Sequence, residues 1–220
     1  MALILKNHHS DCYLSLGYWS RLYAAYLVHN SYGTAQFLYT LYLDRSHGAV
    51  AGDIPIDCKE LHTDGHTRSG VYEIYPYGTI TSPVRVYCDM HTMGGGWTAI
   101  QKRVNGSLNF VRNWTEYKNG FGTPEQDIWV GNDIIHQLSK EKISSLYVSI
   151  TLLDGTTLYE KYGQFSVANE TEKYQLFLAG LATGTLGDSM LDTGHPDNFD
   201  LSGMYFSTPE TDNDRNTKNC

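Results

Sequence analysis

Short runs in which hydrophobic and polar residues alternate occupy the central part of the chain, and this period-two pattern is typical of half-buried antiparallel strands. Two such runs, Gly70–Tyr75 and Val84–Cys88, are separated by Pro76, Gly78 and Pro83, residues that punctuate antiparallel connections. The pattern therefore predicts a pair of antiparallel strands across residues 70–88.

The strongest hairpin signal lies further along the chain. The turn Asp154-Gly155 joins two β-rich runs, Leu146–Leu153 and Thr156–Tyr162, and Asp-Gly is a favoured two-residue hairpin turn. Further strands are expected from Gly94 through Lys102, where three glycines permit close backbone approach, and over Tyr174–Leu178.

Capping signals predict three short helices. Asp57 stands three residues before Glu60, as in a capping box, and this helix should end near Asp64-Gly65. The other two are a helical turn over Asn113–Lys118 closed by Gly120, and a helix over Ile134–Lys140 capped by Asn132-Asp133.

The two ends of the chain carry weaker patterns. Residues 1–53 are rich in Tyr, Leu and His and have no assigned role; they could form short helices at Trp19–His29 and Ala35–Leu43, or a poorly ordered leader. Beyond Gly180 the chain is polar and irregular, and such long regions are usually functional or unstructured. We expect an α+β domain at 54–220, with a twisted antiparallel sheet, short helices and a large irregular loop region.

Composition excludes several classes of protein. The 220 residues carry a net charge of −8, which disfavours nucleic acid as a partner, because phosphate backbones are bound by clustered Lys and Arg. A chain with this negative charge is better suited to bind cations than anions. No run of 18 or more apolar residues occurs, so no membrane span is expected.

Three N-x-[ST] tripeptides, at Asn105, Asn113 and Asn169, are candidate glycosylation sites and together favour a secreted, extracellular protein. The start of the chain does not confirm secretion. Its apolar patch, Leu22–Val28, is followed by no convincing cleavage site for a signal peptide.

The acidic sequence Asp212-Asn-Asp214-Arg-Asn216 places oxygen-bearing side chains at alternate positions, so that a curling chain can present them to one hard cation such as Ca²⁺. Thr217 stands where an EF-hand requires glycine, and no flanking helices are predicted, so an EF-hand is not expected. An acidic surface turn without metal is the alternative.

Cys58 and Cys88 could close a disulfide loop. A zinc site is the alternative, because Cys58, His62 and His66 follow at helical spacing, although Gly65 should end the helix before His66.

No catalytic motif occurs: the chain has no G-x-S-x-G elbow, no H-E-x-x-H, no P-loop and no G-x-G-x-x-G. His195 lies near Asp192 and Asp197, but solvated loop residues explain this arrangement better than an acid–base pair. We therefore expect that the protein is not an enzyme.

A longer series of motifs resembles the fibrinogen C-terminal domain, which is shared by fibrinogen chains, ficolins, tachylectins, tenascins and angiopoietins. The resemblance covers about Ile56–Cys220, in order and without long gaps. Its motifs are Asp57-Cys-Lys-Glu-Leu61, Thr67-Arg-Ser-Gly-Val-Tyr72, Ile74-Tyr-Pro76, Val86-Tyr-Cys-Asp-Met90, Gly94-Gly-Gly-Trp-Thr98, Gln101-Lys-Arg103, Phe110, Asn113-Trp114, Tyr117, Gly120-Phe-Gly122, Trp129-Val-Gly131-Asn132, Tyr162, Phe165-Ser166, Gly187-Asp-Ser-Met190, Phe206-Ser-Thr208, Asp212-Asn-Asp214 and Asn219-Cys220.

The resemblance implies specific site residues. The first two cysteines of the family domain pair, which corresponds to a Cys58–Cys88 disulfide. The family's calcium site corresponds to carboxylates of Asp212 and Asp214 and main-chain carbonyls of Asn216 and Lys218. Just upstream, Pro209 and Glu210 depart from the usual residues.

Family members continue past the position of Cys220 with a second cysteine, which is bonded to the first, and with a final strand that is central in the sheet. In the lectin-like members this segment builds the acetyl-group pocket. By this resemblance the chain is C-terminally truncated, Cys12 and Cys220 are candidates for unpaired thiols, and apolar sheet surface is left open. A homo-oligomer is one expected consequence.

The resemblance implies a secreted, calcium-binding recognition protein, of the lectin type that binds acetylated glycans in innate immunity. The alternatives are an extracellular matrix or signalling ligand of the tenascin or angiopoietin type, which binds a cell-surface receptor, and a non-functional fragment.

Overall fold

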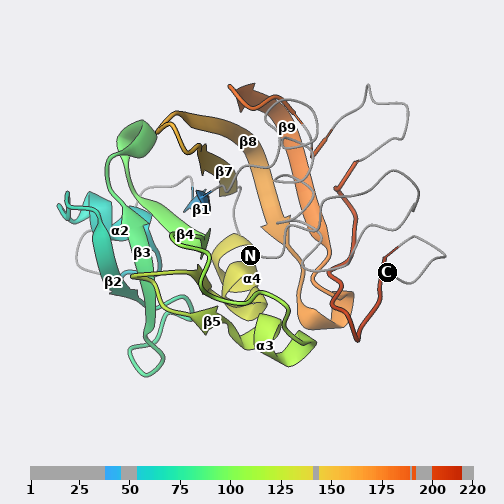
Figure 1. The fold of residues 1–220 in the computed structure, drawn as a ribbon. Helices are drawn as coiled ribbons and strands as arrows, with labels where there is room; N and C mark the ends of the chain where they lie inside the picture. The colour runs from blue at the N-terminus through green and yellow to red at the C-terminus, as the bar shows by residue number, and fades with distance from the viewer. Residues whose placement is uncertain (1–37, 46–53, 141–143, 189, 192–199, 215–220) are drawn as a thin grey trace.

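The computed structural model describes residues 38–45, 54–140, 144–188, 190–191 and 200–214 (Figure 1). The elements are β1 (Leu38–Arg45), α2 (Cys58–Thr63), β2 (Gly70–Ile74), β3 (Val84–Asp89), the 3-10 turn η2 (Thr92–Gly94), β4 (Trp97–Lys102), α3 (Trp114–Asn119), β5 (Phe121–Gly122), β6 (Ile128–Trp129), α4 (Asn132–Ser139), β7 (Ser144–Thr151), β8 (Thr157–Val167), the 3-10 turn η3 (Glu170–Glu172) and β9 (Leu176–Gly184).

The described strands form one antiparallel sheet in the order β2-β3-β4-β1-β7-β8-β9, with the short strands β6 and β5 added beside β4. Short helices pack against this sheet, so the α+β class is confirmed. No helix in the described ranges is both long and apolar enough to cross a membrane.

The predicted strands at residues 70–102 and the Asp154-Gly155 hairpin are confirmed. In the hairpin turn, Thr156 N donates to Asp154 Oδ1 at 2.8 Å, which closes the loop between β7 and β8. Strand β9 runs further than expected, to Gly184, because its pairing with β8 continues through an irregularity between Tyr162 and Gln164.

Strand β1 is the main correction to the sequence analysis. The helix considered for Ala35–Leu43 is wrong over residues 38–43, which are extended and pair with β4 on one side and β7 on the other. Alternation explains the strand: Leu41 and Leu43 contribute to the core, and Leu43 is only 2% exposed. The sheet surface that we expected to stand open at its centre is therefore occupied by β1 in the described structure.

Two of the three predicted helix starts are confirmed. Asp57 accepts from Glu60 N at 2.9 Å, and Asn113 forms a capping box with Glu116 at the start of α3. The third predicted helix is present as α4, but its predicted cap at Asn132-Asp133 is wrong, because Gly131 is the N-cap residue. The Asn132 side chain instead accepts a hydrogen bond from Trp129 Nε1 at 3.0 Å.

The core lies between the sheet and helix α4, which sits behind the central strands in Figure 1. Buried residues of α4 (Ile135 and Leu138) join Leu43, Val148 and Tyr162 of the sheet in this cluster. The segment after β9 returns beside that strand, since Leu176 N donates to Met204 O at 2.9 Å. This return brings residues 206–214 to helix α3.

Candidate functional site

Residues 207–214, called here the acidic loop, contain the described part of the predicted calcium site. Thr208 and Thr211 exchange backbone hydrogen bonds of 3.0 and 3.1 Å, which makes a tight turn. Asn213 then fixes the chain, because its Nδ2 donates to Phe206 O at 2.9 Å and its backbone N donates to Ser207 Oγ at 3.0 Å. Asp212 and Asp214 therefore flank a residue that is bound back onto the body of the domain.

The two aspartates fit a hard cation in their donor chemistry. Asp212 is exposed and Asp214 is half-buried, and Asp214 N donates to Asp212 Oδ1 at 3.0 Å, so the chain already curls round this point. Carboxylate oxygens are the ligands that Ca²⁺ prefers. The other two predicted ligands, Asn216 and Lys218, lie outside the described residues, and within the described ranges no group of three or more His, Cys, Asp or Glu could hold a metal.

A buried aromatic residue directly precedes the acidic loop. Phe206 is 1% exposed and its ring lies 5.1 Å from that of Tyr117 and 5.9 Å from that of Trp114. The ring of Trp129 stacks on it at 6.2 Å. Because these three partners come from α3 and β6, the start of the acidic loop is held to the helical side of the domain.

Glu210 makes a second attachment to α3, which the sequence analysis treated only as a departure from the family pattern. Its carboxylate accepts from the backbone N of Trp114, the first residue of α3. Thr208 is fully buried beside this turn, and its Oγ1 has no hydrogen-bond partner among the described residues. The contact between Glu210 and α3 joins positions far apart in the sequence, so no local pattern could have revealed it.

A network of charged and aromatic groups supports this end of α3. Lys118 forms an ion pair with Glu170, whose other oxygen accepts from Trp114 Nε1 at 3.0 Å. The hydrogen bond from Lys118 holds the pKa of Glu170 below its usual value. Tyr174 donates to Asp133 Oδ1 at 2.6 Å, and burial is the main reason why the pKa of this tyrosine is raised.

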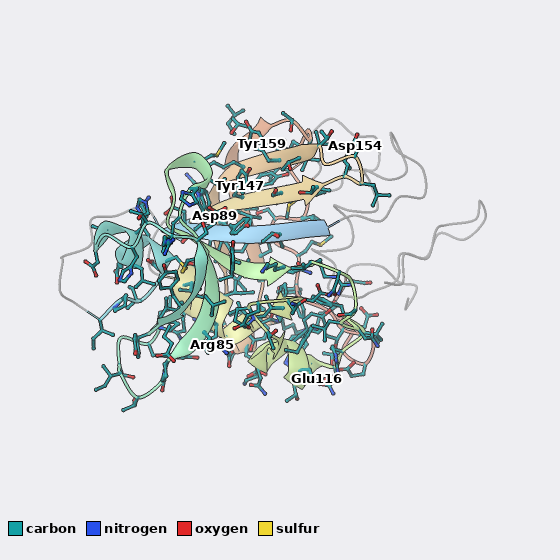
Figure 2. All side chains as sticks on the ribbon, turned by 60° about the vertical axis from the view of Figure 1, so that its left-hand side comes forward. Arg85, Asp89, Glu116, Tyr147, Asp154 and Tyr159 are labelled. Carbon is teal, nitrogen blue, oxygen red and sulfur yellow. A yellow bond between two sulfur atoms is a disulfide. The ribbon has the colours of Figure 1, made fainter. Side chains whose placement is uncertain are left out.

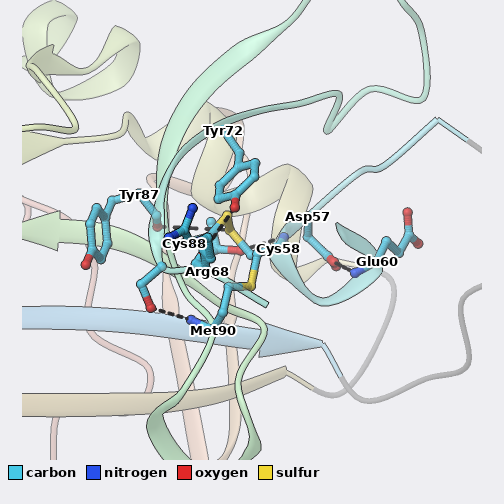
Figure 3. The surroundings of a disulfide bond; sticks show 10 residues. Asp57, Cys58, Glu60, Arg68, Tyr72, Tyr87, Cys88 and Met90 are labelled. Carbon is cyan, nitrogen blue, oxygen red and sulfur yellow. Dashed lines mark hydrogen bonds between the residues drawn. A yellow bond between two sulfur atoms is a disulfide. The ribbon is translucent and has the colours of Figure 1, made fainter. Parts of the chain in front are cut away.

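The Cys58–Cys88 disulfide is present in the structure, with a Cα–Cα distance of 5.5 Å (Figure 3). It joins the start of α2 to β3. The zinc alternative is therefore wrong, because a disulfide sulfur is not a thiolate ligand. The remaining cysteines, Cys12 and Cys220, lie outside the described residues, as do His195, Asp192 and Asp197.

The three candidate glycosylation sites stand in different settings. Asn105 is exposed in a loop, where its Nδ2 donates to Gln126 Oε1 at 3.1 Å. Asn113 is exposed at the start of α3, and half-buried Asn169 starts η3; both use the side-chain oxygen to cap a helix. The side-chain amide nitrogen of each of these two asparagines takes no part in the cap hydrogen bond.

Comparison with protein families gives a match over most of the chain. The model for the C-terminal globular domain of fibrinogen beta and gamma chains matches residues 54–220. Human fibroleukin is 45% identical over 159 residues, which cover 72% of this chain and 35% of fibroleukin. Bovine angiopoietin-4 is 39% identical over 164 residues, covering 74% and 31% of the two chains. Mouse microfibril-associated glycoprotein 4 is 40% identical over 171 residues, covering 76% and 63%.

Solved structures agree with this match. The fibrinogen-like globe domain of human ANGPTL6 superposes with a TM-score of 0.67 at 34% identity, covering 80% of this chain and 73% of that domain. Lamprey fibrin D-dimer, complexed with the peptide ligand Gly-His-Arg-Pro-amide, gives a TM-score of 0.68 at 30% identity and covers 92% and 64%. The chain spans about a third of the length of fibroleukin and of angiopoietin-4.

Proposed function

Because this chain belongs to the family of fibrinogen C-terminal globular domains, we propose that it is an extracellular recognition domain that binds a protein partner. The observation that carries the proposal is its similarity to angiopoietin-4 and fibroleukin. Angiopoietins belong to the part of the family for which the resemblance implied a protein receptor. The role assigned to this chain is binding, and it includes no catalytic step.

The charge of the chain supports a partner with a basic segment. The net charge is −8, and the acidic loop presents Glu210 and Asp212 as exposed residues. Tyr205, which precedes the acidic loop in the sequence, is 37% exposed, with Lys173 Nζ 5.5 Å from its ring centre. Tyrosine is among the residues enriched at protein-binding surfaces. The peptide ligand of the similar lamprey fibrin structure carries a histidine and an arginine.

The basic-partner proposal is tested with the full chain immobilised on a biosensor surface. The probe is Gly-His-Arg-Pro-amide, and Gly-Ala-Ala-Pro-amide is the uncharged comparison. We expect binding of the basic peptide alone, weakened by added salt, because charges on a protein surface are screened. Glu210→Gln should weaken it, while Asp64→Asn, an exposed change at the end of α2, should not. Equal binding of both peptides would contradict the proposal.

We also propose that Asp212 and Asp214 hold Ca²⁺ through their carboxylates, with main-chain oxygens of Asn216 and Lys218. The ion would supply positive charge beside the two carboxylates, and the hydrogen bonds from Asn213 would hold the chain in the curl that this needs. Calcium at a hundred times its dissociation constant should stabilise the fold by about 2.7 kcal/mol.

Thermal unfolding with calcium, with magnesium and with chelator measures this effect. We expect the wild type to gain stability with calcium, and Asp212→Ala and Asp214→Ala each to lose that gain. Asp64→Ala is the matched control. The calcium site is absent if the wild type unfolds at one temperature in all three solutions.

Binding of acetylated glycans is the second candidate function. It rests on the resemblance to the lectin-like members of the family, whose sugar pocket lies beside the calcium site in the segment that follows the position of Cys220. Retention of the full chain on an N-acetylglucosamine matrix in calcium, and its release by chelator, is the expected result for this function. Retention unaffected by chelator or by free sugar would exclude it.

Secretion is proposed with glycosylation at Asn105, Asn113 and Asn169. Expression in secretory cells should give a product whose mass falls on treatment with an N-glycosidase. Removing the hydroxyl residue of each tripeptide in turn (Ser107→Ala, Thr115→Ala, Thr171→Ala) should identify which asparagines are used. A mass that glycosidase leaves unchanged would exclude glycosylation.

A further inference from the structure

The slot between β4 and β7 is filled by a strand from outside the region that matches the family. The family match begins at residue 54, whereas β1 is Leu38–Arg45. Figure 2 shows β1 in pale blue at the middle of the sheet, beside the strand that carries Tyr147. We propose that this slot is a binding site for one extended strand, that β1 is its resident occupant, and that β1 of a second copy of the chain can take its place.

Backbone pairing provides most of the attachment. β1 pairs with β7 at eight positions in register, from Leu38 with Thr151 to Arg45 with Ser144. On the other side it pairs antiparallel with β4, with one shift of register between Leu41 and Tyr42. Without β1, the facing edges of β4 and β7 would be left with unpaired N–H and C=O groups, and such edges accept an added strand.

Side chains give the slot its specificity. On the core side, Leu43 is buried and Leu41 packs against the core cluster. On the opposite side, the ring of Tyr42 lies 6.0 Å from that of Tyr147, and Asp44 lies 3.9 Å from Lys59 Nζ. An occupant must therefore be apolar at two alternate positions and carry an acid one residue after the second, which is the pattern of β1 itself.

These contacts do not depend on which copy supplies the strand. In the sequence β1 is joined to the family-matched region only through residues 46–53. A strand donated by a second copy would make the same ladder and the same side-chain contacts, so exchange depends on protein concentration and not on new interactions. This inference is independent of the ligand-binding proposals above.

Thr40 and Ser149 offer a direct test, because they are register partners on β1 and β7 and both are half-buried. In a full-length chain with Cys12→Ser and Cys220→Ser, the double variant Thr40→Cys, Ser149→Cys should form a link within one chain. Failure of this link would show that β1 does not occupy the slot, and would overturn the proposal.

The exchange itself is tested with the two single variants. Thr40→Cys chains and Ser149→Cys chains are mixed, unfolded in urea without reductant, refolded together and oxidised. We expect a linked dimer in which mass spectrometry identifies the disulfide-joined peptides that contain positions 40 and 149, in a yield that rises with protein concentration. The matched control replaces Ser149→Cys by Ser166→Cys, a half-buried position on β8 that does not pair with β1.

The target pair should give at least ten-fold more linked dimer than the control pair. Equal yields would show random contact and overturn the proposal. A second measurement uses the unmodified chain and a fluorescent peptide of residues 38–45. Slow uptake of this peptide is expected, with none for a peptide carrying Leu41→Lys and Leu43→Lys; equal uptake of both would overturn the proposal.

Discussion

Asp127 provides the sharpest test of what stabilises the fold, because its buried carboxylate accepts hydrogen bonds from several backbone N–H groups of one loop. The side chain is 1% exposed, and its oxygens accept from the backbone N of Val104 at 2.6 Å, Asn105 at 3.2 Å and Leu108 at 3.2 Å. Arg103 Nε lies 3.9 Å away. Desolvation would raise the pKa of Asp127, but the hydrogen bonds outweigh it and hold the pKa below its usual value.

We expect Asp127→Asn to destabilise the domain. The amide removes the negative charge and replaces one accepting oxygen by an NH₂ group that faces backbone donors. A hydrogen bond to a charged group contributes about 1.5–3 kcal/mol, and at least one such bond is lost, so the free energy of unfolding at neutral pH should fall by about 2–4 kcal/mol. Asp127→Ala should cost more, because it leaves all three N–H groups without an acceptor.

The difference between wild type and Asp127→Asn should depend on pH in one direction. The carboxyl has a lower pKa folded than unfolded, where it is about 3.9. Its stabilisation is therefore fully present above the unfolded pKa and is lost as the pH falls through the folded pKa. The two proteins should differ by a constant amount from pH 7 down to about pH 5, and should converge in stronger acid.

Urea unfolding, followed by tryptophan fluorescence over a series of pH values, measures both effects. Asp64→Asn, an exposed substitution at the end of α2, is the control and should leave the stability nearly unchanged. The reasoning is refuted if Asp127→Asn costs less than about 0.5 kcal/mol at neutral pH, the range of ordinary surface changes. The reasoning is also refuted if Asp127→Asn lowers the free energy of unfolding by the same amount in strong acid as at neutral pH.

Two further predictions concern the framework. Replacing Cys58 and Cys88 by alanine should lower the free energy of unfolding by about 3.6 kcal/mol, because the disulfide no longer restricts a loop of 30 residues in the unfolded chain. Urea unfolding measures this loss. A loss of less than about 1 kcal/mol would contradict this entropic account. Gly120→Ala should cost well over 1 kcal/mol more than Gly78→Ala, because both glycines have positive φ but a Cβ at Gly120 would lie 2.6 Å from Val130 O while one at Gly78 would meet nothing. Equal thermal shifts for the two variants would show that the close approach at Gly120 is relieved without cost.

Local chemistry explains which parts of the fold could be predicted from the sequence. The Asp154-Gly155 turn and the capping of α2 by Asp57 are decided by residues at most three positions apart, and both are confirmed. The Cys58–Cys88 pair followed from the resemblance, whereas spacing alone also allowed zinc. Asp212 and Asp214 could be named as cation ligands from their spacing, but their binding of calcium stays a prediction.

Long-range contacts explain what could not be predicted. The alternation at Leu41 and Leu43 is compatible with a strand, but nothing near Ala35–Leu43 indicates that residues 38–45 lie between two strands far along the chain. Asn132 looks like a helix cap in the sequence, yet its oxygen is used by Trp129. The attachment of Glu210 to Trp114 is equally invisible to any short window of residues.

The central position of β1 also sets an order of events during synthesis. Leu41 lies opposite Gln101 on one side and Val148 on the other, so the strand emerges from the ribosome long before either neighbour exists. Until β7 is made, β1 can pair on one side only, with β4, and closing such distant contacts is slow. The middle of the sheet can therefore be completed only after β7 has emerged.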